Sequence, residues 1–103
     1  MSTRLQALLD AVESLPHDPF PRYGLALEYK GLGRREEAVE TFRKLMDGSP
    51  DYLPAYLQAG MVLMDLGRAD QAREVLERGV DVAGRKGDGH ARSELMAALA
   101  SLS

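Results

Sequence analysis

The chain has 103 residues, of which 45% are hydrophobic and 28% are charged, a composition that favours one folded domain over a disordered chain. It contains no cysteine, which excludes disulfides, thiolate zinc sites and cysteine nucleophiles. The net charge of −3 mixes both signs along the chain, so there is no basic field of the kind that attracts nucleic acid. No apolar run approaches the ~20 residues of a membrane-spanning helix, and no apolar core of a signal peptide is present, so we expect a cytoplasmic protein that binds no membrane.

Three helices are predicted in the first half of the chain. Apolar residues at helical spacing indicate a helix over residues 2–14, and Pro16 stops it because the residue before a proline disfavours helical geometry. A second helix follows, with Pro21 in its first turn, where a proline is well tolerated. A third is predicted over 36–47, since acidic residues in its first turn complement the helix dipole.

The second half repeats this plan and adds one helix. A fourth helix is predicted from Pro54 to about Leu66, and a fifth over 70–84. A sixth runs to Leu102, with Asp88 or the glycine after it as its cap. The sequence therefore predicts an all-α fold of six helices joined by short loops, with no strand.

A period of 34 residues underlies this plan. Residues of the same kind recur at that spacing in Gly33 and Gly67, Ala38 and Ala72, and Phe42 and Leu76. The first helix is in register with the second helix of such a pair, because Leu8 lies 34 positions before Phe42. Repeated helical pairs of this kind cannot bury their apolar faces alone, and stacking gives them one continuous core.

The pattern resembles the tetratricopeptide repeat family, whose period and small-residue positions it shares. The first copy supplies Leu25, Ala26, Tyr29, Gly33, Ala38, Phe42 and Pro50. The second copy supplies Tyr56, Ala59, Gly60, Leu63, Gly67, Ala72 and Leu76. The resemblance implies a right-handed α-α superhelix in a single domain. Its expected parts are an N-terminal half repeat (1–18), two full repeats (19–52 and 53–86) and a C-terminal capping helix (87–103).

The sequence departs from the family pattern at four places. Arg22 replaces the first aromatic residue, Gly84 stands where a proline is expected, and Leu45 and Gly79 occupy an alanine position. After Gly87 the pattern fades unless one residue is inserted in the loop. We therefore interpret the last helix as a cap that covers the apolar flank of the fifth helix.

Chemistry-bearing residues are sparse. His17 and His90 are the only histidines and lie far apart in the sequence, so we expect neither to bind a metal. Gly31-Leu32-Gly33 follows a helix and lacks the strand-turn-helix context of a phosphate-binding loop. The carboxylates are spread among basic residues rather than paired for acid/base work. We predict no enzymatic activity, no metal and no cofactor.

The resemblance implies a binding function instead, because the first helix of each pair lines a concave groove in that family. The residues that register places there are mainly apolar: Phe20, Tyr23, Leu27, Lys30, Leu57, Met61, Met64 and Asp65. An apolar groove with two methionines suits an apolar surface of a partner peptide or helix. The alternative is a self-associating module, whose apolar face is covered by its own last helix or by a second copy in a homodimer.

Overall fold

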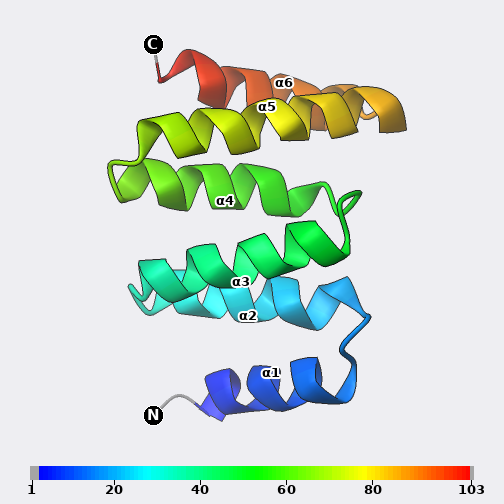
Figure 1. Cartoon of the computed structure of the whole chain (residues 1–103), viewed down its shortest axis with the longest axis vertical. Coiled ribbons are helices and arrows are strands. Elements are labelled where there is room, and N and C mark those ends of the chain that lie inside the picture. Colours follow the sequence, from blue (N-terminus) through cyan, green and yellow to red (C-terminus); the bar gives the residue numbers. More distant parts are fainter. Residues whose placement is uncertain (1–2, 103) are drawn as a thin grey trace.

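The computed structural model of the protein describes residues 3–102. Within that range every regular element is a helix, which confirms the prediction of six helices without strands (Figure 1). The helices are α1 (Thr3–Ser14), α2 (Pro19–Gly31), α3 (Arg35–Gly48), α4 (Pro54–Asp65), α5 (Ala69–Lys86) and α6 (Gly89–Ala100). Ser2, with which the first helix was expected to begin, lies outside the described residues.

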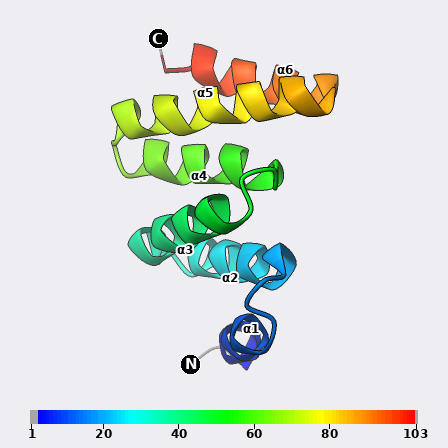
Figure 2. The ribbon, with the colours of Figure 1, turned by 45° about the vertical axis from the view of Figure 1, so that its right-hand side comes forward.

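The helices form one stack, with α1 and α6 at opposite ends (Figure 1). The two predicted pairs are present, since α2 packs on α3 and α4 packs on α5, and α3 on α4 joins one pair to the next. The axes turn along the stack, so that α1 is seen nearly end-on where α4 and α5 are seen from the side (Figure 2). This arrangement is the expected superhelix of helical pairs.

Small residues stand where the paired helices approach most closely, as the period predicted. Ala26, Ala38 and Ala72 are fully buried. A Cβ added at Gly60 would lie only 2.5 Å from Cδ2 of Leu76, so there is no room for a side chain between α4 and α5 at this point. Larger side chains would force these helix axes apart.

Large apolar residues fill the interior of the stack. Phe42 and Leu76, at equivalent positions of the two repeats, have no exposed surface, and Tyr56 is 1% exposed. The Tyr56 hydroxyl donates a hydrogen bond to the Pro50 carbonyl oxygen at 2.6 Å, which satisfies the one polar group of this buried ring. The core therefore runs without interruption from α2 to α6.

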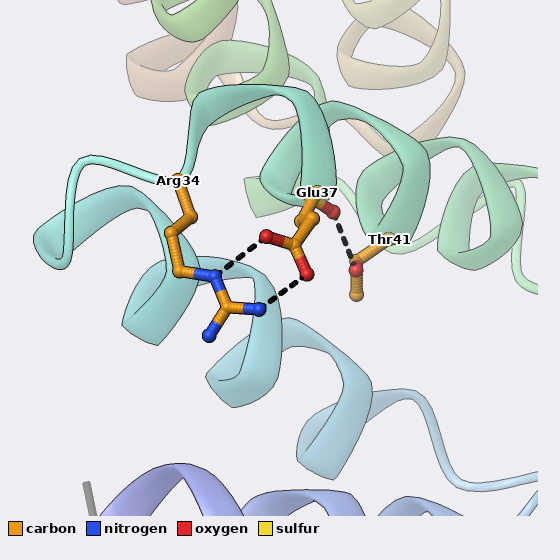
Figure 3. Close-up of polar contacts among 3 residues, drawn as sticks. All are labelled: Arg34, Glu37 and Thr41. Atoms are coloured by element: carbon orange, nitrogen blue, oxygen red, sulfur yellow. Dashed lines mark hydrogen bonds and ion pairs between the residues drawn. The ribbon is translucent and has the colours of Figure 1, made fainter. Parts of the chain in front are cut away.

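The turn between α2 and α3 is fixed by charge as well as by glycine. Arg34, the residue before α3, reaches forward so that Nε and one terminal nitrogen donate to the two carboxylate oxygens of Glu37, at 2.5 and 2.6 Å (Figure 3). The Thr41 hydroxyl donates to the Glu37 backbone carbonyl at 2.7 Å. The guanidinium of Arg34 also lies 5.0 Å from the centre of the Tyr29 ring, which ties α2 to the start of α3.

The predicted end of α5 was wrong. The helix continues past Gly84 to Lys86 and ends at Gly87, which takes a left-handed conformation with φ +70°. Glycine keeps the backbone N–H that proline lacks, so its presence at the proline position of the repeat lets the helix run on.

Gly67 is expected to be required for the α4–α5 turn. Its φ of +74° is in the left-handed region, where the Cβ of any other residue would lie too close to the following carbonyl oxygen. Gly67→Ala should therefore lower the free energy of unfolding by about 1 kcal/mol in urea denaturation. The matched control is Gly31→Ala, whose Cβ would enter open space at the end of α2. An equal loss in both variants would contradict this account of the turn.

Candidate functional site

A cleft of about 370 Å³ lies where α2, α4 and α6 face one another. These are the first helices of the two pairs together with the last helix of the chain. The cleft is lined by Tyr23, Leu53, Pro54, Leu57, Gln58, Asp88, His90, Ala91, Glu94 and Leu95.

The floor of the cleft is apolar and firmly held. Leu53 and Leu95 are buried members of the core, and Tyr23 and Leu57 are half-buried against it. The ring of Tyr23 packs against two other aromatic rings, with its centroid 5.3 Å from that of Tyr52 and 6.3 Å from that of Phe42. Tilted contacts of this kind fix the orientation of the Tyr23 ring, so the floor is preorganised.

The two tyrosines at this end of the cleft keep their protons. Burial raises the pKa of the Tyr23 hydroxyl, and the neighbouring Tyr52 raises it further. Burial likewise raises the pKa of Tyr52, and the negative charge of Asp18 adds to the effect. Because an unperturbed tyrosine already titrates near pH 10, both hydroxyls are neutral at physiological pH and can donate hydrogen bonds.

The rim of the cleft is polar. Nζ of Lys30 donates a hydrogen bond to Oε1 of Gln58 at 2.8 Å, which connects α2 to α4 across the concave side. On α6, Nε2 of His90 lies 3.2 Å from Oε1 of Glu94, and both side chains are largely exposed. The remaining rim residue, Asp88, caps α6.

That cap also accounts for the orientation of α6. The Asp88 carboxylate accepts a hydrogen bond from the Ala91 backbone N–H at 3.0 Å, as the sequence predicted. Leu95 then enters the notch left by Gly79 on α5 and is 1% exposed. The cap and this buried side chain both help to hold the wall of the cleft in place.

The structure distributes the eight predicted groove residues over three environments. Tyr23 and Leu57 line the cleft. Three residues are half-buried beyond it: Leu27, Lys30 and Met64. The other three are exposed: Phe20, Met61 and Asp65. Their assignment to one binding surface remains a prediction, with Phe20, 70% exposed, the residue least attached to the cleft.

The sequence model of the tetratricopeptide repeat matches residues 29–99. The chain belongs to the tetratricopeptide repeat family. The match includes most of α6, where the residue pattern alone had faded. A search among curated proteins found no match to this sequence.

Solved structures of other tetratricopeptide repeat (TPR) proteins share the fold. A TPR domain protein from Salinibacter ruber is 33% identical, over 85% of this chain and 89% of its own, with a TM-score of 0.81. The TPR2B domain of yeast Sti1, in complex with pHsp70, is 16% identical over 95% and 78%, with a TM-score of 0.89. PcrH, in complex with the chaperone-binding region of PopD, is 15% identical over 95% and 74%, with a TM-score of 0.88.

The sequence left open whether the last helix covers the apolar face, and it did not identify the α6 residues that line the cleft. Four lining residues come from that helix or its cap besides the buried Leu95: Asp88, His90, Ala91 and Glu94. The helix itself was predicted, but its placement against α4 depends on Leu95 meeting Gly79, which are far apart in sequence. Gly79 was noted as a departure from the repeat pattern, and this departure was the available signal.

The described residues contain neither a candidate metal site nor a candidate membrane-spanning helix. Among residues 3–102, no three His, Cys, Asp or Glu side chains are grouped so that they could hold a metal ion. Over the same range, no helix has the length and apolar character needed to cross a membrane.

Proposed function

We propose that this TPR chain is a protein-interaction module that binds a peptide or helix of a partner protein in the cleft between α2, α4 and α6. The observation that carries the proposal is an apolar cleft, open to solvent, on a rigid floor that the core supports. Two proteins of the same fold are seen with a partner, Sti1 TPR2B with pHsp70 and PcrH with a region of PopD, which supports the same use of the fold here.

The apolar surface extends from the cleft along α4. Leu57, Met61 and Met64 follow one another at intervals of four and three residues, so they lie along one face of that helix. Met61 is 40% exposed, a large apolar area for a side chain outside the core. Methionine adapts its shape to the groups it meets, so this stripe suits the side chains of a partner.

The same rim offers no catalytic arrangement, so the proposal is for binding without an enzymatic activity. The Asp88 carboxylate is engaged as the cap of α6. His90 and Glu94 contact each other on an open helix face, with no serine, threonine, cysteine or lysine among the cleft's lining residues for them to activate.

Met61→Glu is expected to abolish partner binding without unfolding the chain, because the new carboxylate points into solvent in the free protein and is desolvated by an apolar partner. The measurement is affinity capture from a cell extract, followed by mass spectrometry and a binding titration with the captured protein. The matched control is Met96→Glu, because Met96 is 47% exposed on α6 and is not part of the apolar stripe of α4. A partner that binds the Met61→Glu variant as well as the native chain would contradict the proposed site.

Self-association remains the second hypothesis for the same surface. The exposed Met61 is the observation that favours it, whereas α6 walls the cleft on one side and does not fill it. Sedimentation equilibrium over a range of concentrations separates the two, since a homodimer through this face has a concentration-dependent mass that Met61→Glu reduces to that of a monomer. A monomer at all concentrations would dismiss it.

A further inference from the structure

The charges around the cleft are unequal. Asp88 and Glu94 stand on the α6 side, and Asp65 follows Met61 by one turn on α4. Against these three carboxylates stand two ammonium groups: that of Lys30 is held by Gln58, and that of Lys86, two residues before Asp88, is held by the Asp51 carbonyl oxygen. His90 adds no charge when neutral. The apolar stripe is therefore bordered by carboxylates at both of its ends.

We infer that the partner segment is a basic amphipathic helix, whose apolar face covers Leu57, Met61 and Met64 and whose Lys or Arg side chains flank that face. This inference rests on the proposed binding function of the cleft. Three apolar side chains spaced like the stripe span about 10 Å along a helix. Basic residues at the two ends of that span then lie beside Asp65, which directly follows Met64, on one side and beside Glu94 and Asp88 on the other.

The backbone of the cleft offers a partner segment no pairing. Its walls are three α-helices, whose N–H and C=O groups bond within each helix, so they offer no edge for pairing with an extended chain. A helical partner satisfies its own backbone groups and needs only side-chain contacts from the cleft. The charge on the rim then decides which amphipathic helices bind.

The test uses three fluorescent peptides with leucines at helical spacing, identical except that the flanking residues are all lysine, all glutamine or all glutamate. Fluorescence anisotropy with the full chain should give about tenfold tighter binding of the lysine peptide than of the glutamine peptide, from a few exposed charge pairs together. Added salt should narrow this difference because it screens exposed charges. The glutamate peptide should bind most weakly.

Asp65→Asn with Glu94→Gln should remove most of the preference for lysine. The control is Glu40→Gln with Glu77→Gln, which changes the net charge equally at exposed positions on α3 and α5. An equal effect of the control pair would overturn the inference, because the attraction would then come from net charge alone. Equal binding of the lysine and glutamine peptides would overturn the charge preference while leaving the cleft as a binding site.

Failure of all three peptides to bind would overturn the inference as well. The capture experiment tests the proposed function separately, because it compares how the Met61→Glu and Met96→Glu variants bind the natural partner.

Discussion

Phe42→Ala is expected to lower the free energy of unfolding by about 3–5 kcal/mol, a large part of the stability of a domain of this size. Phe42 has no exposed surface and belongs to the core cluster that extends from α2 to α6, in ring contact with Tyr23. Its removal would leave a cavity that the neighbouring helices can close only by moving together. Urea denaturation followed by circular dichroism gives the change.

The chain contains its own control for this substitution. Phe20 is 70% exposed at the start of α2, so Phe20→Ala removes the same atoms from a position that adds little to the core. We expect a change within about 0.5 kcal/mol. If Phe42→Ala costs no more than Phe20→Ala, the two pairs do not share the continuous core described above.

Gly79→Leu should have the next largest effect, because it gives the second repeat the residue that the first repeat has at Leu45. A Cβ at Gly79 would lie 2.7 Å from Cβ of Tyr56 and 3.0 Å from Cδ2 of Leu95. The side chain would displace Leu95 and with it α6. Overpacking of this kind costs about 1–3 kcal/mol.

Hydrogen exchange is the more specific measurement for Gly79→Leu, since the amides of α6 should lose protection while those of α2 and α3 keep theirs. Gly84→Leu is the control on the same helix, because a Cβ there meets no atom within 4 Å. Retention of α6 protection in Gly79→Leu would contradict the role assigned to the notch.

The sequence was sufficient for most of the fold because the fold is repetitive. Ala38 in the first repeat and Ala72 in the second each predicted a close crossing of two helices, and both are fully buried. The helix ends were harder to predict. Gly84 suggested the end of α5, but a glycine inside a helix lowers stability by only about 1 kcal/mol and does not break hydrogen bonding, so the helix continued.

Less of the candidate site than of the fold could be predicted from the sequence. Register identified Tyr23 and Leu57, because their positions follow from the two aligned pairs. It could not identify the α6 wall, since the repeat pattern fades after Gly87 and the contact between Leu95 and Gly79 exists only in three dimensions. The hydrogen bond from Lys30 to Gln58 was missed for the same reason. It joins helices of two different repeats, and the pattern within one repeat does not say which of their side chains face each other.

The most direct test of the account is a nuclear magnetic resonance titration of the labelled chain with its captured partner segment. If the cleft between α2, α4 and α6 binds the partner, the largest chemical-shift changes will fall on amides of those three helices, Tyr23, Leu57 and Ala91 among them. Changes confined to the outer faces of α3 and α5 would contradict it.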